Sequence, residues 1–319
     1  MSSGSSLTAA DVKRKAAEIG FDACGVAPAA AHPELTFFDE WISRGYAGEM
    51  TYLARSAADR ADIHRVMPSV RSVIATATLY NTNRPYSTQN SEHGRAHVAR
   101  YAWGDDYHAV ITGRLNALLS WMHKTSPQEF QACVYVDTGP IQERVFAQHA
   151  GIGWIGKNSC VINPALGSWL FLGEILCSLP LSPDVPALDQ CGTCTLCIDG
   201  CPTQAIVGPG VLDATRCISY LTIEKPGEMP ADLSAGVGTH IYGCDVCQEV
   251  CPWNQSAPTS SDPAWQPRPI WDARTVGELA ESSDAELRAG LRGSSMDRAK
   301  LSGLRRNLGV ALENSADGG

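Results

Sequence analysis

The chain has 319 residues, of which 44% are hydrophobic, and its formal net charge is -9. This length is enough to bury a sizeable core and is typical of roughly two domains. The acidic balance argues against a protein that coats nucleic acid over its whole surface, because phosphate binding needs positive charge, although local basic patches remain possible. No apolar run approaches the ~18 residues of a bilayer-spanning helix, and none precedes the first charges. We therefore expect a cytoplasmic monomer without a membrane partner.

Helices and strands are predicted to alternate along the first part of the chain. A helix is expected over residues 7–19, because Thr8 and Asp11 form a capping-box pattern and Gly20 follows as a stop. The next predicted elements are a strand over 21–28, a helix over 37–57, a buried β-branched strand over 70–80, and a helix over 106–124 with one apolar face.

The alternation continues to about residue 180. The expected elements are a strand over 132–137, a helix over 141–150, a turn-rich stretch over 151–159, and strands over 160–164 and 168–177. This order predicts an α/β domain over residues 1–183, ended by a proline-rich segment. Residues 184–258 hold too many cysteines, glycines and turns for a conventional core, so bound metal must supply much of their folding energy. Residues 259–319 are expected to form a short helical C-terminal segment, helical over 275–313.

Eight of the twelve cysteines lie between residues 191 and 251 at short, regular spacings. This crowding favours a metal site in a reducing compartment over disulfides. The first motif has the spacing C-x2-C-x2-C-x3-C-P of bacterial ferredoxins, in which the fourth cysteine ligates the other cluster. The second motif repeats the last three positions of the first, and Cys217 supplies its missing cysteine.

Crossing over the terminal cysteines predicts two 4Fe-4S clusters. The first set is Cys191, Cys194, Cys197 and Cys251, and the second set is Cys201, Cys217, Cys244 and Cys247. A pair of all-cysteine zinc sites is the alternative, but a repeated C-x2-C-x3-C-P run is poorly explained by tetrahedral zinc. The remaining cysteines, expected to be buried packing residues, are Cys24, Cys133, Cys160 and Cys177. Two clusters in series indicate a one-electron relay, which should deliver to a site in the first 180 residues.

The stretch GIGWIGKNS over residues 151–159 matches the glycine patterns of two nucleotide-binding loops. Those loops require a strand before and a helix after, whereas here a predicted helix comes before and a strand after, which argues against a nucleotide site. The glycines indicate that the backbone closely approaches another group, with Lys157, Asn158 and Ser159 as nearby donors. A helix C-cap with a tight turn explains the same pattern equally well.

Asp137 ends a hydrophobic strand, and a helix is expected to start near Pro140. Asp137 or Thr138 could simply cap that helix, and the spacing alone favours this interpretation. The functional alternative is a general acid, because α/β domains place ligands at the ends of strands. Another polar group of residues, ARYAWGDDYH, includes Arg100 and His108. Arg60 and Arg65 would by default be solvated.

These motifs together resemble the epoxyqueuosine reductase family, which completes queuosine synthesis in tRNA. The matching elements span residues 7–255 and are RYAWGDDYH, VDTGPIQER, AGIGWIGKNS, LGEIL, the cysteine run, CISYLTIE and YGCDVCQEVCPWN. The resemblance implies a cobalamin-binding α/β domain joined to a ferredoxin-like domain with two 4Fe-4S clusters. It also implies that the corrin cobalt accepts the electrons and that epoxyqueuosine at the wobble position of tRNA is reduced to queuosine.

The same resemblance implies roles for individual residues. Asp137 would be the proton donor, and for this its pKa must be raised by burial against the corrin. Lys225 would contact the anticodon loop of tRNA, and an external donor such as a flavodoxin or ferredoxin would supply electrons. The candidate cobalamin contacts are Arg60, Arg100, Asp137, Lys157, Asn158, Ser159, Ser219, Gly243, Cys244 and Asp245.

Binding of tRNA conflicts with the overall acidity unless basic patches exist. One candidate patch near the carboxyl end is Arg288, Arg292, Arg298, Lys300, Arg305 and Arg306, although an ordinary solvated helix face is an equal alternative. Many family members continue into a helical-repeat segment, whereas about 60 to 70 residues follow the last cysteine here, within the short-domain range. The rival functions are a dehalogenase-like cobalamin reductase, disfavoured by the DTGP and GIGWIGK elements, and an electron-transfer protein without a substrate of its own, which would bind no cobalamin.

Overall fold

The computed structural model describes residues 6–89 and 94–317. Its centre is a four-stranded sheet in the order β1-β2-β7-β4. These strands are β1 (Ala23–Pro28), β2 (Ser72–Leu79), β7 (Leu170–Cys177) and β4 (Ala132–Tyr135). Each neighbouring pair is antiparallel, and Glu174 lies opposite Ala75 of β2 and Tyr135 of β4. The predicted alternation of helices and strands is therefore present without the parallel sheet that it usually builds.

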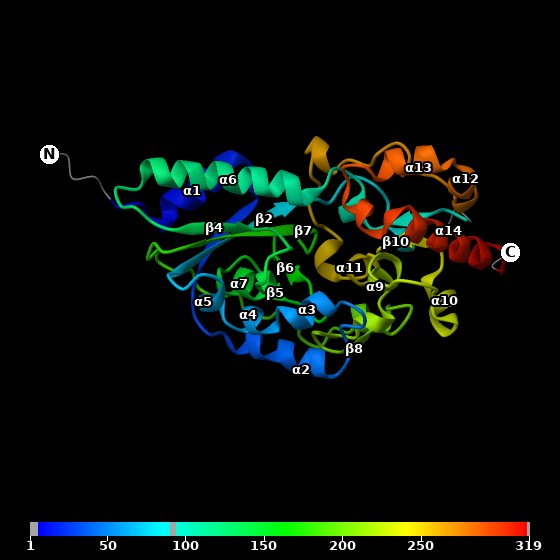
Figure 1. Cartoon of the computed structure of the whole chain (residues 1–319), viewed down its shortest axis with the longest axis horizontal. Coiled ribbons are helices and arrows are strands. Elements are labelled where there is room, and N and C mark those ends of the chain that lie inside the picture. The colour runs from blue at the N-terminus through cyan, green and yellow to red at the C-terminus, as the bar shows by residue number, and fades with distance from the viewer. Residues whose placement is uncertain (1–5, 90–93, 318–319) are drawn as a thin grey trace.

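Helices cover both faces of this sheet (Figure 1). Helices α1 (Ala9–Ile19) and α6 (Tyr107–Thr125) lie on one face, and α6 packs Ile111 and Leu115 against Gly173 of β7. Helix α7 (Glu143–His149) lies on the other face, where Val145 and Phe146 join a second buried cluster. The sheet thus separates two apolar cores.

Most predicted elements of the first part are present, but the helix predicted over 37–57 is wrong. The chain divides there because Gly45 and Gly48 adopt positive φ angles of 76° and 55°, which break the helix. The predicted strand over 160–164 shortens to two residues. The segments in this region are η1 (Pro33–Thr36), α2 (Phe37–Ser43), α3 (Thr51–Arg55), α4 (Ala57–Ala61), α5 (Ile63–Val66), η2 (Ser87–Gln89), β3 (His97–Val98), η3 (Arg100–Ala102), β5 (Trp154–Ile155) and β6 (Val161–Ile162).

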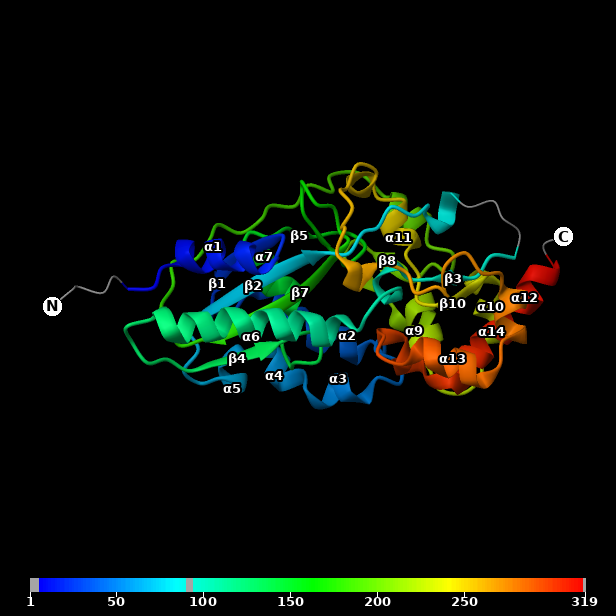
Figure 2. The same ribbon diagram turned by 90° about the horizontal axis from the view of Figure 1, so that it is seen from above.

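The cysteine-rich part contains short elements beside one end of the sheet, with the C-terminal helices next to it (Figure 2). The helical prediction for 275–313 is confirmed, with breaks at Ser282 and Arg292. The elements in chain order are α8 (Leu196–Asp199), β8 (Ile206–Gly208), β9 (Val211–Leu212), η4 (Ala214–Arg216), α9 (Ile218–Ile223), α10 (Ala231–Val237), β10 (His240–Tyr242), α11 (Val246–Glu249), η5 (Pro252–Asn254), η6 (Pro263–Trp265), α12 (Val276–Glu281), α13 (Asp284–Leu291), η7 (Ser295–Ala299) and α14 (Lys300–Asp317).

The C-terminal helices share a core with two earlier parts of the chain. Leu304 and Leu308 of α14 are buried with Ile241 of β10 and Val98 of β3. Strands β3 and β10 also pair in parallel. The three predicted segments are therefore interleaved in space, and their exact boundaries stay predictions. Across residues 6–89 and 94–317, no helix has the length and apolarity needed to cross a membrane.

Candidate functional site

The eight clustered cysteines are free thiols that interact within two separate sets. The pKa of Cys251 is raised to about 11, mainly by burial, and the charges of Cys191, Cys197 and Cys194 contribute to the increase. Burial likewise raises the pKa of Cys244, and Cys217 and Cys201 add to that increase. The charges of Cys244 and Cys217 also contribute to the raised pKa of Cys247, after a hydrogen bond with Cys160 and burial. The structure therefore places these thiols near one another in the two groups that the crossed-over spacing predicts, and their role as cluster ligands stays a prediction.

The donor set of each group fits a 4Fe-4S cluster. Within the part of the chain that the structure describes, no three His, Cys, Asp or Glu side chains converge on one ion position. A cubane spreads its four thiolates over four iron atoms, so its ligands need not converge in this way. Protein N–H groups already point at two of the sulfurs: the Ala205 amide donates to Cys201 Sγ at 3.2 Å, and Trp154 Nε1 donates to Cys191 Sγ at 3.4 Å. Hydrogen bonds to sulfur are one means of tuning cluster potentials.

The glycine-rich stretch 151–159 braces both cysteine sets. Lys157 Nζ donates to the carbonyl oxygens of Gly192 and Cys194 at 2.6 and 2.8 Å. Asn158 is buried, and its Nδ2 donates to the Cys247 carbonyl at 3.2 Å. Ser159 has a φ of 64°, and its Oγ donates to the Gly210 carbonyl at 3.2 Å. The close approach predicted from the glycines is made elsewhere: a Cβ at Gly153 would lie 2.3 Å from the Ile162 carbonyl oxygen, and one at Gly151 would lie 2.7 Å from that of Val185.

Ser219 and the turn at Gly243 lie around the second cysteine set. Burial raises the pKa of Cys217, and hydrogen bonds from the Ser219 amide and hydroxyl lower it. Gly243 has a φ of 66°, and a Cβ there would lie 2.6 Å from the Cβ of Ala99, so the position requires glycine. Asp245 is 7% exposed, and burial raises its pKa to about 7. These residues lie next to the thiols of the second set, and their predicted contact with cobalamin stays a prediction.

Arg100, another candidate cobalamin contact, is buried among aromatic rings and main-chain carbonyls. Its side chain is 2% exposed and lies over the rings of Trp103 and Trp169, 4.5 and 5.3 Å from their centroids. Its guanidinium donates to the carbonyls of Thr82, Arg84 and Pro85. The Arg100 amide donates to Asp245 Oδ2 at 2.6 Å, so this residue anchors the second cysteine set through the backbone.

Asp137 does not cap a helix. Helix α7 begins after Gln142, which makes no side-chain cap, so the capping interpretation is wrong. Asp137 instead has a φ of 57° and a side chain that is 62% exposed. Its amide donates to Glu143 Oε1 at 2.6 Å, and its Oδ2 lies 3.4 Å from His108 Nε2. The other ring nitrogen, Nδ1, lies 2.7 Å from Asp106 Oδ1.

In the protein alone, the groups around Asp137 hold its pKa below the ordinary value. The hydrogen bond with His108 lowers the pKa of Asp137, with burial acting in the opposite direction. Burial lowers the pKa of His108, but its hydrogen bonds with Asp137 and Asp106 reverse this and raise it overall. In the protein alone, the proton of this pair is therefore held by the imidazole, and the rise in the Asp137 pKa expected from burial against the corrin stays a prediction.

Further ionisable groups lie near Asp137, and of these sequence reasoning missed Glu143 and Tyr52. Burial raises the pKa of Glu143 to about 8, and the charge of Asp137 contributes to this shift. Burial lowers the pKa of Arg60 and the charge of Asp137 raises it, while Arg60 Nη1 donates to the Ile141 carbonyl at 2.9 Å. Burial raises the pKa of Tyr52, which is 40% exposed. The charge of Asp137 adds to this increase and the charge of Arg60 opposes it. A further buried acid, Glu174, could have been found from the sequence, because it is the one charged residue within the apolar stretch LGEIL.

Several of the basic residues predicted to contact tRNA form ion pairs or hydrogen bonds within the protein. Lys225 Nζ lies 3.1 Å from Glu49 Oε1. Arg298 and Arg305 pair with Glu224 and Asp284, and Arg306 donates to three main-chain carbonyls. Arg65 pairs with Asp59. The side chains of the candidate patch that are classed as exposed are Arg288, Arg292, Arg298 and Lys300.

Of the four cysteines outside the two sets, Cys177 is buried as expected. Cys24 and Cys133 pack against the two apolar cores as expected but, like Cys160, are only partly buried, so the prediction of burial is wrong for these three. Cys160 lies against Cys247, and their hydrogen bond lowers the pKa of Cys160.

Comparisons with known proteins agree with this geometry. Residues 190–254 match the family model "4Fe-4S double cluster binding domain", and residues 60–138 match "Epoxyqueuosine reductase QueG, DUF1730". An epoxyqueuosine reductase of Gloeobacter violaceus is 42% identical over 97% of both chains. The chain belongs to the epoxyqueuosine reductase family. The epoxyqueuosine reductase of Xanthomonas campestris is 38% identical over 96% of this chain and 87% of its own.

Solved epoxyqueuosine reductases share the whole fold. One, crystallised with a tRNA-Tyr epoxyqueuosine-modified stem loop, is 32% identical with a TM-score of 0.85, over 97% of this chain and 81% of that chain. Another, from Bacillus subtilis, has its aspartate-bearing catalytic loop swung out of the active site. It is 30% identical with a TM-score of 0.83, over 97% of this chain and 82% of that chain.

Proposed function

We propose that this protein reduces epoxyqueuosine at the wobble position of tRNA to queuosine, with cobalamin as the redox centre and two 4Fe-4S clusters as its electron supply. The observation that carries this proposal is the assembly of eight thiols into two sets of four, in a chain that is 42% identical to an epoxyqueuosine reductase over nearly its full length. The clusters would be held by the two sets described above. An external flavodoxin or ferredoxin would reduce them.

Cobalamin would lie between the second cysteine set and Asp137. The residues there fit such a group, because Asp137, Ser159 and Ser219 present partly or fully exposed polar side chains that suit the amide groups around a corrin. Arg60, the turn at Gly243 and the Cys244 backbone complete the proposed contacts. Arg100, Lys157, Asn158 and Asp245 would act by fixing the cluster loops. Bound cobalamin supplies a low-valent cobalt that is both nucleophile and reductant.

The protein's own part in the reaction is proton delivery. Asp106 accepts a hydrogen bond from His108 Nδ1 and so orients Nε2 toward Asp137. We propose that protonated His108 passes its proton to Asp137, which protonates the oxygen leaving the epoxide. Binding of substrate and cofactor over the exposed Asp137 carboxyl would remove water from it and favour its protonated form.

Binding of tRNA would use the anticodon loop. Single-stranded RNA loops are recognised by splaying individual bases into protein pockets, which needs few phosphate contacts and is compatible with an acidic protein. Lys225 and the exposed Arg288, Arg292 and Lys300 are the proposed phosphate contacts. The tRNA stem loop in the related crystal structure supports this mode.

The test is anaerobic conversion of epoxyqueuosine-containing tRNA by the purified protein loaded with both cofactors. We expect queuosine with the wild-type chain and none with Asp137→Asn, which should keep iron and cobalamin at wild-type levels. Full activity of the asparagine variant would remove Asp137 from the mechanism. Failure of the wild-type protein to bind cobalamin would favour a simple electron-transfer protein.

A further inference from the structure

Glu174 is a buried acid without an evident structural partner. It lies in the middle of the central strand β7, between Ala75 of β2 and Tyr135 of β4, and its side chain is 0% exposed. Among the described residues, neither of its carboxylate oxygens has a hydrogen-bond partner. A buried polar group without a partner costs stability, so this glutamate calls for a functional explanation.

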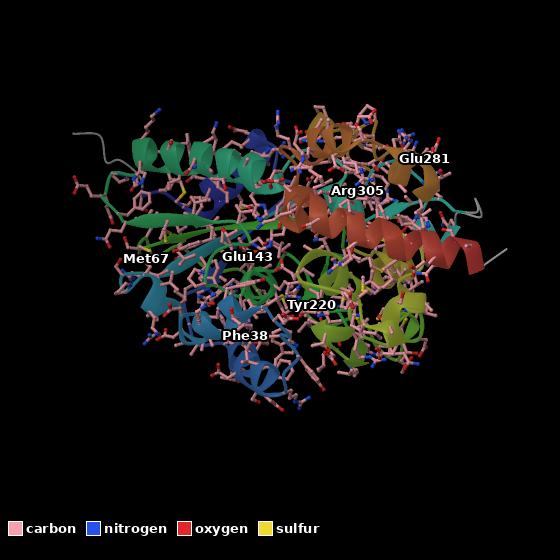
Figure 3. The ribbon with its side chains drawn as sticks, turned by 45° about the vertical axis from the view of Figure 1, so that its right-hand side comes forward. Phe38, Met67, Glu143, Tyr220, Glu281 and Arg305 are labelled. Atoms are coloured by element: carbon pink, nitrogen blue, oxygen red, sulfur yellow. The ribbon has the colours of Figure 1, made fainter. Side chains whose placement is uncertain are left out.

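Glu174 lies on the same side of the sheet as Glu143. Residues alternate along a strand, so Glu174 shares a face with Leu172 and Leu176, which pack into the apolar cluster on the α7 side. Glu143 opens α7 on that side, beneath the sheet (Figure 3). Burial raises the pKa of Glu174, and the charge of Glu143 is the other contribution to that increase.

The two glutamates continue a row of carboxyls that begins at Asp137. Glu143 Oε1 accepts the Asp137 amide at 2.6 Å, and the Asp137 charge raises the pKa of Glu143 after burial has done so. Three carboxyls this close cannot all ionise, because like charges repel strongly where water is excluded. The negative charge therefore stays at the exposed end, on Asp137 beside His108, and the two inner acids keep their protons at neutral pH.

We propose that Glu143 stores the second proton of the reaction and delivers it through Asp137. In this proposal Glu174 stays protonated and stabilises the Glu143 anion that the transfer leaves. This inference rests on the proposed function. Reduction of an epoxide to an alkene breaks both C–O bonds, forms the C=C bond, takes up two electrons and two protons, and releases water. The clusters supply the electrons, and both protons go to the departing oxygen.

The surrounding groups suit a store that must release its proton. Arg144 and His108 lower the pKa of Glu143, and so stabilise its anion after transfer. The departing oxygen is a far stronger base than a carboxylate, so the overall transfer is downhill even though it passes through Asp137. No cation is among the groups that shift Glu174, which is faced by Tyr135 from β4 and by Glu143 from α7. No hydrogen bond joins the two glutamates in this structure. The neutral O–H of Glu174 would form one with Glu143 when that residue becomes an anion, and Glu143 would regain a proton from solvent between turnovers.

The test compares Glu143→Gln and Glu174→Gln with the control Glu281→Gln, which changes an exposed glutamate on α12 (Figure 3). The first readout is the infrared carbonyl stretch of protonated carboxyl groups in the substrate-free holoenzyme at pH 7. We expect each core substitution to remove part of this band and the control to leave it unchanged. The second readout is the single-turnover rate, expected to fall about tenfold in Glu143→Gln, less than the ~10²–10⁴-fold typical of a direct general acid.

Outcomes separate this inference from the proposed function. If wild-type protein makes no queuosine, the proposed function fails, while the infrared band still reports on the acid pair. If wild-type protein is active and Glu143→Gln matches its rate, the proton store is refuted and the proposed function stands. Should the variants not fold, titration of the wild-type band decides: loss of a component near pH 8 supports the store, and absence of any protonated carboxyl at pH 6 overturns it.

Discussion

Asp137 combines an unfavourable backbone with an exposed carboxyl. A non-glycine residue at a φ of 57° costs on the order of 1–3 kcal/mol and persists when its surroundings enforce it. Here Oε1 of the Glu143 carboxyl group accepts a hydrogen bond from the Asp137 amide and supports that conformation. The sequence places Asp137 at a strand end but does not distinguish a cap from an acid, because that distinction depends on His108 and Asp106, which are about 30 residues distant in the chain.

The pH dependence of catalysis tests the His108–Asp137 pair. The pKa of His108 is raised above its ordinary value mainly by hydrogen bonds to Asp137 and Asp106 that outweigh burial, so the imidazole is charged below that raised pKa and loses its proton above it. We therefore expect kcat/KM to fall as pH rises through this pKa. The His108→Gln variant should lose this limb of the profile and react about 10²-fold more slowly. A profile unchanged by the substitution would contradict the role of His108.

Among the secondary-structure elements, the sheet and its long helices follow from the apolar pattern, whereas the region from 37 to 61 does not. Its helical periodicity is interrupted by Gly45 and Gly48, which both have a left-handed backbone, and at Gly48 a tertiary contact requires glycine. At Gly48, a Cβ would lie 2.5 Å from the hydroxyl oxygen of Tyr220, a residue of the cysteine-rich part. Such a contact between distant segments is not visible in a local pattern.

Close packing of β1 on α7 gives a stability prediction. A Cβ at Gly25 would lie 2.0 Å from the carbonyl oxygen of Ala150, so Gly25→Ala should destabilise the protein by about 1–3 kcal/mol. The matched control is Gly277→Ala in α12, where a Cβ has nothing within 4 Å and a gain of a few tenths to about 1 kcal/mol is expected. Thermal melting of the two holoproteins measures the difference. Equal melting temperatures would show that the β1–α7 contact is looser than the structure indicates.

The buried acid on β7 also predicts how stability varies with pH. The pKa of Glu174 is raised by burial and by Glu143, so above the ordinary glutamate pKa the unfolded chain binds fewer protons at this site than the folded chain. Stability should then fall as pH rises from 5 to 8, by at most about 1.4 kcal/mol per pH unit from this group. Glu174→Gln should flatten this dependence. A variant with the wild-type slope would show that Glu174 is ionised in the folded protein.

For the molecule as a whole, the spacing of the cysteines alone indicates the pairing of two sets, because ligand spacing is a local property. The interleaving of the C-terminal helices with residues 97–98 is not local. It rests on a two-residue parallel pairing of β3 with β10 and on the apolar face of α14. Neither the short strand pairing nor the packing partner of α14 has a recognisable sequence pattern. The sequence therefore predicts a separate C-terminal segment.

The crossed-over sets predict a selective loss of iron. Cys217→Ser removes a thiolate from the second set and leaves the first set intact, so the variant should keep one cluster of two after anaerobic reconstitution. The control Cys133→Ser changes a thiol outside both sets and should retain the full iron content. Iron analysis with electron paramagnetic resonance of the reduced protein distinguishes the two. Loss of both clusters, or of neither, would contradict the assignment.

The most direct test of the whole account is nucleoside analysis of epoxyqueuosine-containing tRNA after anaerobic incubation with the reduced, fully loaded protein. The account predicts that epoxyqueuosine disappears and that a nucleoside lighter by one oxygen atom, queuosine, appears in equal amount. Unchanged epoxyqueuosine, in protein shown to contain both clusters and cobalamin, would contradict it.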